Sequence, residues 1–481
     1  MPARVPVQAV PVLAPVEAGR IVFLETTEMN NFGSFITRLK TKSQTQNPAP
    51  PAAGIYHFQR QWAEDERSRI HLRIDSSGDG LLLVNASKVV HLNPTAAFMA
   101  YLTLQQTPAV QAYRAITRHF QVPQKQAQAD YALCAQQVEE LIRPDGACPI
   151  HDLELEVTAP FSARPSAPYR MDLAITYRCN NDCAHCYNAR SRDYPELTTE
   201  KWKQILDKLW SLGIPHVVFT GGEPTLREDL AELIAHAEHN GQITGLNTNG
   251  RRLSDKGYLE SLVQAGLDHV QITLESHDPN IHDEMVLCKG AWKQTVCGIR
   301  NALETRLFVM TNTTMLRLNS PGMAETLDFL ASLGVPTIGL NALIYAGKGL
   351  EVGSGLPESS LVQLLNLARE KTESSGQKLI WYTPTQYCNF DPMQLELGVK
   401  GCTAALYNMC IEPNGDVIPC QSYYSTLGNM LNQSWDKIWN HDLAVSLRER
   451  RYTPSKCTDC ALLSECGGGC PLRLHVDDHA L

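Results

Sequence analysis

Between residues 65 and 145 the chain carries short alternating or apolar runs, followed by longer runs with helical periodicity. Alternation with a period of two is typical of strands, and apolar positions recurring every three to four residues indicate helices. The predicted strands are Ile70–Ile74, Gly80–Val84 and Val89–Leu92. A first helix is predicted to begin at Asn93-Pro94, and two more are predicted at Ala109–Phe120 and Pro123–Ile142. Asn suits a helix N-cap and Pro the first helical position. This segment is therefore predicted to be a small α+β module of winged-helix-like topology.

From Met171 onward, apolar runs of strand length alternate with amphipathic helical runs. The predicted strands are Asp172–Thr176, His216–Thr220, Ile243–Thr248, His269–Leu274, Leu307–Thr313 and Thr337–Leu343, with helices such as Thr199–Leu212 and Leu230–Glu238 between them. Repeated β-α units form parallel sheets with right-handed crossovers. Because there are six units and not eight, the predicted fold class is α/β with a partial (β/α)6 TIM-like barrel. A helix at Glu358–Ser374 and a strand at Lys378–Tyr382 are predicted to follow.

Segments that contain proline set the expected domain limits. Gln46–Ala53 is rich in Pro and Ala, and the stretch 150–169 is again interrupted by Pro, so both are predicted linkers. We therefore expect an N-terminal extension with its linker at 1–64, the α+β module at 65–145, the barrel at 165–385 and a cysteine-rich domain at 398–481.

Composition and charge disfavour several classes of protein. The 481 residues are 43% hydrophobic and 19% charged, which is ordinary globular composition. The net charge of -9 disfavours a nucleic-acid binder, which usually carries a basic surface. There is no run of about 18 apolar residues that would predict a membrane span, and the proline-broken start lacks the apolar segment of a signal peptide. We therefore expect a cytoplasmic protein with no nucleic-acid or membrane partner.

The spacing of the cysteines points to metal chemistry. Of the 15 cysteines, three lie within Cys179–Cys186 and seven lie between Cys402 and Cys470. In a reducing compartment such clusters indicate metal binding or catalysis and not a disulfide framework. The five others, which we expect to be buried small side chains or inert surface thiols, are Cys134, Cys148, Cys288, Cys297 and Cys388.

The first group of cysteines reads Cys179-Asn-Asn-Asp-Cys183-Ala-His-Cys186 and follows the first barrel strand. Three thiolates this close together suit a soft metal. Three ligands would also leave one iron of an iron–sulfur cluster open to a cofactor or substrate, as catalytic metal sites keep one position open. A zinc site made of the three cysteines and His185 has the same spacing and stays an alternative.

The pattern Cys-x₃-Cys-x₂-Cys after the first strand of a β-α barrel resembles the radical S-adenosylmethionine (AdoMet) superfamily. The resemblance implies that Cys179, Cys183 and Cys186 bind three irons of a catalytic [4Fe–4S] cluster and that AdoMet chelates the fourth iron. It also implies reductive cleavage of AdoMet to a 5'-deoxyadenosyl radical, which abstracts hydrogen from the substrate. The electron would come from a donor such as flavodoxin or ferredoxin.

Polar residues at the carboxyl ends of the predicted strands add to this resemblance. Gly221-Gly222-Glu223 resembles the family's GGE motif at the AdoMet amino group, because glycines allow close backbone approach and Glu223 offers an acceptor. Further candidate AdoMet contacts at this edge, where β/α barrels build active sites, are Asn249, Thr273, Glu275 and Asn312. Each patch alone is more typical of a turn or helix cap. The arginine that the family places near the AdoMet carboxylate is absent, and Lys289 is the candidate replacement.

The C-terminal cysteines form two further groups. Gly415-Asp416 lies between short apolar runs and predicts a hairpin turn that brings Cys410 and Cys420 together. Two structural zinc sites would fit the Cys-x₂-Cys spacing. The order of these cysteines also resembles the SPASM extension of radical AdoMet enzymes, which holds two auxiliary Fe–S clusters.

The SPASM resemblance implies a ligand set for each auxiliary cluster. The first set is Cys402, Cys410, Cys420 and Cys470, and the second is Cys457, Cys460 and Cys466. The downstream cysteine that is usual in this family is missing. The alternatives at the second position are an open iron, ligation by His475 or Asp477, a zinc ion, or no metal at all.

The α+β module, with Leu-Asn-Pro-Thr-Ala-Ala at 92–97, is similar to the PqqD-like peptide-recognition element of peptide-maturation systems. In that family a leader peptide adds a strand to the edge of the sheet. The rival is a winged-helix DNA-binding module, which the near-balanced charge of this segment disfavours.

Together these resemblances imply a radical AdoMet maturase of a ribosomally made precursor peptide, whose leader binds the N-terminal module. The expected product is a thioether or a carbon–carbon crosslink. The alternatives are a sulfatase-maturating type oxidase of Cys or Ser, and a non-catalytic iron–sulfur or zinc-binding regulator. The sequence assigns no general base or other catalytic side chain.

Overall fold

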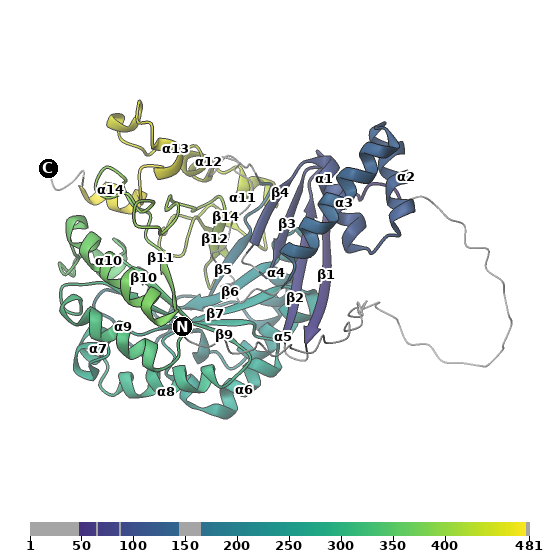
Figure 1. The fold of residues 1–481 in the computed structure, drawn as a ribbon. Helices are drawn as coiled ribbons and strands as arrows, with labels where there is room; N and C mark the ends of the chain where they lie inside the picture. Colours follow the sequence, from purple (N-terminus) through teal and green to yellow (C-terminus); the bar gives the residue numbers. More distant parts are fainter. Residues whose placement is uncertain (1–47, 64–65, 86–87, 144–164, 478–481) are drawn as a thin grey trace, which may run out of the picture.

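Two β-sheets organise the chain. The computed structural model describes residues 48–63, 66–85, 88–143 and 165–477. A four-stranded antiparallel sheet, in the order β1-β2-β3-β4, belongs to the N-terminal module (Figure 1). A ten-stranded sheet, in the order β11-β10-β9-β8-β7-β6-β5-β12-β13-β14, runs through the rest. Most of the predicted 150–169 linker and Cys148 lie outside the described residues.

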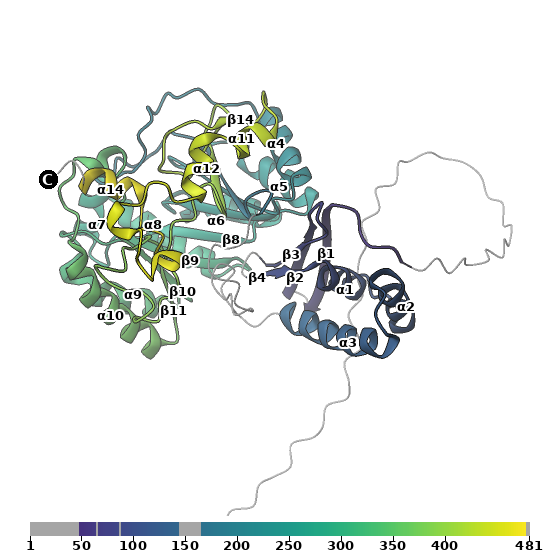
Figure 2. The same ribbon diagram turned by 90° about the horizontal axis from the view of Figure 1, so that it is seen from above.

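The N-terminal module contains the predicted strands and helices. Its elements are β1 Gly54–Ala63, β2 Glu66–Ile74, β3 Gly80–Val84, β4 Lys88–Leu92, α1 Pro94–Leu104, α2 Ala109–Phe120 and α3 Gln124–Leu141. The predicted cap is confirmed, since the Asn93 side-chain oxygen accepts a hydrogen bond from the Ala96 backbone N–H at 2.9 Å. The three helices lie on the face of this sheet that points away from the barrel (Figure 2).

The first strand of the module was not predicted. β1 lies within the segment that the sequence assigned to the N-terminal extension, and it pairs antiparallel with β2 from Gly54 to Ala63. Tyr56, Phe58 and Trp62 alternate along β1 and pack on the same apolar cluster as β2 and β3. This alternation is the usual strand signal. It was overlooked because β1 directly follows the Pro/Ala-rich linker, so the antiparallel sheet has four strands and not three.

The second unit is the predicted partial barrel of parallel strands. Its strands are β5 Arg170–Thr176, β6 His216–Gly221, β7 Ile243–Thr248, β8 His269–Thr273, β9 Phe308–Thr314, β10 Thr337–Asn341 and β11 Lys378–Trp381. The helices are α4 Thr199–Ser211, α5 Leu230–Asn240, α6 Lys256–Gln264, α7 Pro279–Val286, α8 Ala291–Leu303, α9 Met323–Ser332 and α10 Glu358–Ser375. Short 3₁₀ turns lie at Pro224–Leu226, Arg252–Ser254, Ser320–Gly322 and Gly347–Leu350. All six predicted strands are present, and β11 pairs parallel to β10 as a seventh.

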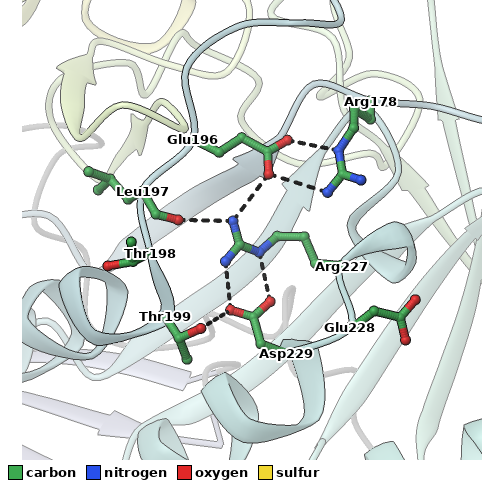
Figure 3. A pocket seen from close by; sticks show the side chains of 8 residues that line it. All are labelled: Arg178, Glu196, Leu197, Thr198, Thr199, Arg227, Glu228 and Asp229. Atoms are coloured by element: carbon green, nitrogen blue, oxygen red, sulfur yellow. Dashed lines mark hydrogen bonds and ion pairs between the residues drawn. The ribbon is translucent and has the colours of Figure 1, made fainter.

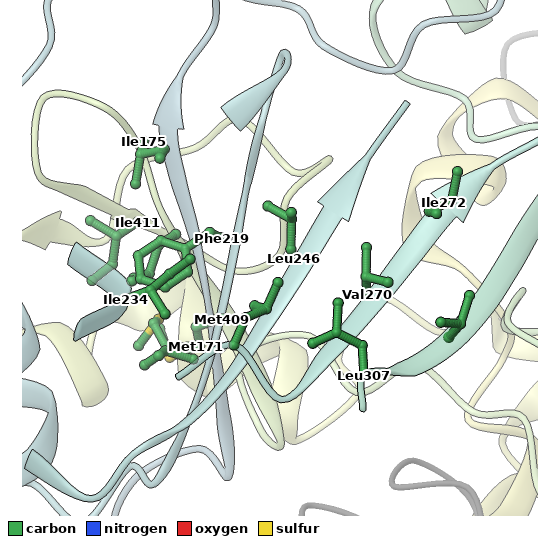
Figure 4. Close-up of a cluster of buried hydrophobic side chains, with 14 of the residues drawn as sticks. Met171, Ile175, Phe219, Ile234, Leu246, Val270, Ile272, Leu307, Met409 and Ile411 are labelled. Carbon is green, nitrogen blue, oxygen red and sulfur yellow. The ribbon is translucent and has the colours of Figure 1, made fainter. Parts of the chain in front are cut away.

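The main core lies between the parallel sheet and its helices. Met171, Phe219, Leu246, Val270 and Ile272 come from four neighbouring strands and are fully buried in it (Figure 4). Strands of parallel sheets are usually buried on both faces, which explains why these segments read as almost continuous apolar runs. The apolar runs therefore form the buried strands of the sheet, and the polar candidate residues lie at the carboxyl ends of these strands.

The cysteine-rich domain continues the barrel sheet. Its elements are β12 Asn408–Ile411, β13 Asp416–Ile418, β14 Gly428–Asn429, α11 Trp435–Trp439, α12 Asp442–Arg448, a 3₁₀ turn Ser455–Cys457, α13 Leu463–Cys466 and α14 Pro471–Asp477. The predicted hairpin is confirmed: β12 and β13 pair antiparallel, and Gly415 between them has a φ of 90°. β12 also pairs parallel to β5, which places Cys410 opposite Asp172.

Buried polar contacts fix the N-terminal module to the barrel. Arg69 on β2 forms ion pairs with Glu238 and Asp268, and its guanidinium donates to the Gln242 carbonyl at 2.7 Å. The adjacent β2 side chain, His71, has its Nε2 2.8 Å from the Gly241 carbonyl oxygen. Arg69 is only 4% exposed, so breaking this contact would leave a buried charge without its partners. The module is thus held in one position on the barrel. No helix in the described ranges is both long and apolar enough to cross a bilayer.

Because four histidines are buried, we predict that the free energy of unfolding decreases in mild acid. Burial lowers the pKa of His57 and of His269 to about 4, and it lowers those of His71 and His216 as well. Above pH 6.5 these rings are neutral in both states. As the pH falls from 6.5 towards 4, the unfolded chain takes up protons that the folded chain refuses, so the free energy of unfolding decreases by about 1.4 kcal/mol per pH unit for each group.

Chemical denaturation at pH 7.5, 6.5, 5.5 and 4.5 measures this loss. A His269→Asn variant should show a shallower dependence on pH than the parent. His239→Gln, which changes an exposed histidine of α5, should leave the dependence unchanged. Equal slopes for the parent and His269→Asn would contradict the assignment.

Candidate functional site

The three cysteines of the first group lie together in the loop after β5. Burial raises the pKa of Cys179 to about 11, and it raises the pKa values of Cys183 and Cys186. The neighbouring thiol of Cys186 raises those of Cys179 and Cys183 further. The three thiols therefore share one buried pocket that excludes much of the surrounding water, as a soft-metal site requires.

Backbone hydrogen bonds join this loop to the Gly-Gly-Glu segment at the end of β6. The Gly222 N–H donates to the Thr176 carbonyl at 2.8 Å, and the Glu223 N–H donates to the Arg178 carbonyl at 2.8 Å. A Cβ atom on Gly222 would lie 2.6 Å from the Tyr177 carbonyl oxygen, and Gly221 has a φ of 138°. Both glycines are thus required by close backbone approach and by backbone conformation.

A Gly222→Ala variant is expected to bind less iron at the site formed by Cys179, Cys183 and Cys186. The added methyl group overlaps backbone oxygen atoms that cannot rotate away, which costs about 1–3 kcal/mol and displaces the loop that carries Cys179. Iron content and AdoMet-dependent changes of the EPR signal, measured after reconstitution, report the effect. Gly257→Ala is the control, since it too changes a glycine but lies in ordinary helical backbone in α6, where the added Cβ would meet only the Asp255 side chain at 3.4 Å. Normal iron content in Gly222→Ala would contradict the expected displacement.

Glu223 connects the ends of β6 and β7. Its carboxylate is 1% exposed and accepts hydrogen bonds from the Thr225 N–H (3.1 Å) and hydroxyl (2.6 Å), from the Thr248 hydroxyl (2.7 Å) and from the Asn249 N–H (2.8 Å). Three of these bonds use Oε1 and one uses Oε2. Since each carboxylate oxygen accepts about two hydrogen bonds, only Oε2 has room for one more donor.

Glu275 connects the end of β8 to the cysteine loop. Its carboxylate accepts a hydrogen bond from the Thr314 N–H at 2.9 Å and lies 2.9 Å from His185 Nε2. His185 stands between Cys183 and Cys186, so Glu275 fixes the ring's orientation within the loop. Because Nε2 faces Glu275, it carries the proton, and the other ring nitrogen, Nδ1, is buried without a hydrogen-bond partner among the described residues.

The other candidate contacts occupy the same edge of the barrel. Asn249 donates to the Asn180 side chain of the cysteine loop at 2.6 Å. Thr273 and Asn312 are paired neighbours on β8 and β9. The side-chain oxygen of Asn312 is buried and lacks a hydrogen-bond partner within the described ranges. Lys289 is exposed in the turn between α7 and α8.

Cationic side chains that the sequence did not single out hold the cysteine loop. Arg192 donates to the Cys179 carbonyl at 3.0 Å, and Arg251 donates to the Asn181 side chain at 2.8 Å. Lys348 binds the Asp182 carboxylate at 2.6 Å. The last turn of α7 adds backbone support, because the Met285 carbonyl accepts from the Ala184 N–H at 3.0 Å. Arg251 lies two residues after the candidate contact Asn249, and this closeness in the sequence is the signal that could have pointed to it.

A shallow pocket of about 480 Å³ lies beside Arg178, the residue that precedes Cys179 (Figure 3). Glu196 accepts hydrogen bonds from both Arg178 and Arg227, and Asp229 accepts two from Arg227. Charges of both signs are thus already paired across its wall. These ion pairs consequently stabilise the start of the cysteine loop, and the side chains that line the pocket offer no unpaired charge to a ligand.

The first C-terminal set of cysteines gathers under β12 and β13. Burial raises the pKa of Cys402, and the thiols of Cys470 and Cys420 raise it further. The Cys420 thiol also raises the pKa of Cys410, whose side chain packs with Ala174, Tyr177 and Ile418 in an apolar cluster. Cys402, Cys420 and Cys470 therefore form a close group, with Cys410 on its barrel side.

The second C-terminal set lies further out, around α13. Burial raises the pKa of Cys457, and the thiols of Cys466, Cys388 and Cys460 raise it further. Cys466 is buried and Cys460 is exposed. The side chains of His475 and Asp477 lie outside the described residues. In the described ranges, no group of three or more His, Cys, Asp or Glu side chains is gathered closely enough to hold a single metal ion.

Comparison with protein families agrees with this arrangement. Residues 173–342 match the model of the radical SAM superfamily, and residues 402–461 match the SPASM model, an iron-sulfur cluster-binding domain. The chain therefore contains a radical SAM domain. A SPASM domain follows it, and the two domains imply an enzyme that uses AdoMet and [4Fe–4S] clusters.

The chain is similar in sequence to enzymes with two different kinds of activity. The Fe-coproporphyrin III synthase of Methanosarcina barkeri is 28% identical over 330 residues, which cover 62% of this chain and 82% of that protein. The PqqA peptide cyclase of Bradyrhizobium diazoefficiens is 28% identical over 316 residues, which cover 63% of this chain and 81% of that protein.

Solved structures share the fold. SuiB of Streptococcus suis bound to S-adenosylmethionine superposes with a TM-score of 0.65 at 18% identity, covering 86% of this chain and 96% of SuiB. Native anSMEcpe with bound AdoMet superposes with a TM-score of 0.51 at 17% identity, covering 63% and 89%. The coverage by SuiB exceeds the share of the chain that follows residue 165, so the shared fold includes part of the N-terminal module.

The residues present fit an iron–sulfur cluster with a bound cofactor. The three cysteines of this loop carry the thiol donors that iron–sulfur clusters require. At the same edge, His185 Nδ1, His282 Nε2 and Asn312 Oδ1 are buried and have no hydrogen-bond partner among the described residues. Buried polar atoms of folded proteins are nearly always satisfied, and a polar ligand at this edge would supply the missing partners.

Proposed function

We propose that this enzyme matures a ribosomally made precursor peptide by forming a thioether or carbon–carbon crosslink. The observation that carries the proposal is the N-terminal module, which is fixed to the barrel by buried polar contacts and part of which is included in the fold shared with SuiB. SuiB has been solved with its precursor peptide SuiA, and a PqqA peptide cyclase is among the relatives.

In this proposal Cys179, Cys183 and Cys186 hold the catalytic cluster, and Gly221, Gly222, Glu223, Asn249, Thr273, Glu275 and Asn312 form the AdoMet site. When bound, the cluster and AdoMet supply a 5'-deoxyadenosyl radical that takes a hydrogen atom from the substrate. Glu223 fixes the loops after β6 and β7 through its four hydrogen bonds. Glu275 orients His185, and the buried strand ends keep water away from the reacting atoms.

The N-terminal module is the proposed leader-binding site. β1 and β4 are the edge strands of its sheet, and an extended leader peptide adds a strand to such an edge through backbone hydrogen bonds. Since the module cannot shift on the barrel without breaking the Arg69 contacts, a bound leader would present the segment that follows it at a fixed distance from the radical site. Cys402, Cys410, Cys420 and Cys470 would hold the first auxiliary cluster, and Cys457, Cys460 and Cys466 the second, which would supply an electron acceptor near the reacting peptide.

The test uses the anaerobically reconstituted full chain with AdoMet, a reductant and the short peptide encoded next to its gene. The expected product is about 2 Da lighter per link, because each link removes two hydrogen atoms. A peptide without its leader should react at least about tenfold more slowly. An unmodified peptide in a reaction that still forms 5'-deoxyadenosine would contradict the proposal.

A tetrapyrrole substrate is the second candidate, since Fe-coproporphyrin III synthase and AdoMet-dependent heme synthase are both among the relatives. Their sequence matches cover 62% and 65% of this chain, and that of the PqqA peptide cyclase covers 63%, so the lengths of these matches do not separate the two substrates. Iron coproporphyrin III, offered in place of the peptide, separates the two. Its consumption together with AdoMet would favour this second function. A sulfatase-type oxidation would instead convert one Cys or Ser of a peptide to an aldehyde without a crosslink.

The proposed reaction needs a one-electron donor, and we propose a flavodoxin or ferredoxin in the cytoplasm for this role. Reducing conditions there keep cysteines available as cluster ligands. The donor assignment is checked by replacing dithionite with reduced flavodoxin or ferredoxin and measuring 5'-deoxyadenosine. Turnover with dithionite but with neither reduced flavodoxin nor reduced ferredoxin would show that these proteins are not the donor.

A further inference from the structure

The second auxiliary set is one ligand short in the SPASM domain itself. Its three cysteines, Cys457, Cys460 and Cys466, leave one iron of a [4Fe–4S] cluster without a thiolate. A segment from another part of the chain that lies against these cysteines is a candidate source of the fourth ligand.

A segment from outside the SPASM domain crosses this site. It runs from Thr385 to Asn389, after β11, and belongs to the connection between the barrel and the first SPASM cysteine. The Tyr387 N–H donates to the Cys466 sulfur at 3.4 Å, and the same sulfur lies 3.6 Å from the Thr385 carbonyl oxygen. A Cβ on Gly469 would lie 2.8 Å from the Gln386 side chain. The connection is thus packed directly on the loop that carries Cys466.

Cys388 sits in this segment, next to Tyr387. The residues around it are anchored: Tyr387 and Phe390 are buried, the Tyr387 hydroxyl accepts from the Lys400 N–H at 2.9 Å, and the Asn389 amide binds Glu358. Cys388 itself is exposed, and its thiol makes one weak contact, 3.9 Å from the Asn389 side chain. The backbone is therefore held in place while the thiol stays free of apolar packing.

We propose that Cys388 is the fourth thiolate ligand of the second auxiliary cluster, together with Cys457, Cys460 and Cys466. The proton leaves the Cys388 thiol, and the sulfur binds the iron that the SPASM cysteines leave open. Cys388 directly follows Tyr387, whose N–H lies 3.4 Å from the Cys466 sulfur, so its thiol starts one residue away from a ligand of this cluster. This proposal rests on the SPASM domain binding a second cluster, and it is independent of the substrate.

The ligand from the connection has a structural consequence. It would tie the end of the barrel, through β11, to the outermost SPASM loop by a covalent metal–sulfur bond. A downstream ligand would instead tie that loop to the C-terminal tail. Cluster loss would then loosen the connection between β11 and Cys402, and not the end of the chain.

The test isolates the auxiliary clusters in a background in which Cys179, Cys183 and Cys186 are all replaced by alanine. This background should hold about eight irons per chain. Adding Cys388→Ala should lower the iron content to about four to seven and give the EPR signal of an oxidised [3Fe–4S] cluster, and adding Cys457→Ala should give a comparable loss. Cys297→Ala, a half-buried cysteine of α8, is the matched control and should retain about eight.

Two outcomes would overturn the proposal. One is a Cys388→Ala protein whose iron, sulfide and EPR signal match those of Cys297→Ala. The other is an iron content of about four in the background that Cys457→Ala does not change, which would mean that the second cluster is absent. Peptide modification is not read in this experiment, so neither result bears on the proposed substrate.

Alkylation of the unmutated protein provides a second measurement that does not depend on a variant folding. Iodoacetamide should label Cys388 in the apo protein, where its side chain is exposed. After anaerobic reconstitution the labelling of Cys388 should fall at least about tenfold, together with that of Cys460. Equal labelling of Cys388 in both forms, with Cys460 protected, would assign the fourth position to another group.

Discussion

Replacing Cys183 with alanine is expected to abolish 5'-deoxyadenosine formation, lowering its rate at least about 1,000-fold. Cys183 lies deepest of the three loop cysteines, and the two other thiols cannot hold three irons of a cluster. The auxiliary sites are built from other segments, so the iron content should fall from about twelve to about eight per chain. Anaerobic reconstitution, iron and sulfide analysis and chromatography of the AdoMet products measure both effects.

The matched control for Cys183→Ala is Cys297→Ala. Cys297, in α8, is also partly buried, and its sulfur makes two long contacts, 4.0 Å from the Ser254 carbonyl oxygen and 3.9 Å from the Asn301 amide nitrogen. The control should keep its iron and its rate within about twofold. A Cys183→Ala protein that makes 5'-deoxyadenosine at the parent rate would remove the loop from the proposed catalytic site.

The second large effect is expected from Glu412, which joins the cysteine loop to the SPASM hairpin. Its carboxylate is fully buried and accepts two hydrogen bonds from Arg190, at 2.6 and 2.8 Å, and one from the Tyr177 hydroxyl at 3.1 Å. Glu412→Ala leaves the arginine and the tyrosine without their acceptor. Removing one partner of such a pair is expected to lower the free energy of unfolding by about 3 kcal/mol.

Denaturation of the apo protein measures this loss, and AdoMet cleavage by the reconstituted protein shows whether the loop after Cys186 is still positioned. Glu449→Ala is the control, since Glu449 pairs with Arg451 at the surface and such pairs contribute about 0–1 kcal/mol. Glu412→Gln keeps two polar atoms and should lose less than Glu412→Ala. Equal stability of Glu412→Ala and Glu449→Ala would contradict the role assigned to this carboxylate.

The fold was largely predictable because its strongest signals are local. β7 has the predicted bounds, Ile243–Thr248, and α2 has the predicted bounds, Ala109–Phe120. Both are bounded by residues that end regular structure, and both carry a clear apolar pattern. β1 was missed although its apolar residues alternate, because the linker before it led us to expect that the module begins only at residue 65.

The site was predictable only in part because motifs report positions on strands and not contacts across them. The Gly221-Gly222 pair could be placed beside Cys179 from the order of strands in a parallel sheet. The contacts of Arg251 and Arg192 with the loop depend on how long side chains fold back, which spacing does not encode. Cys388 was assigned to the scattered cysteines for the same reason, since its neighbours Cys457 and Cys466 are far away in the sequence.

The pairing of β12 with β5 means that the two domains are separate in sequence but share one sheet. A shortened chain that ends near residue 385 would lose β12 and turn β5, the strand that leads to Cys179, into an open edge. Exposed edge strands pair readily with other chains. The radical SAM domain produced alone is therefore expected to aggregate. An exchange of SPASM domains between enzymes should preserve the pairing of β12 with β5.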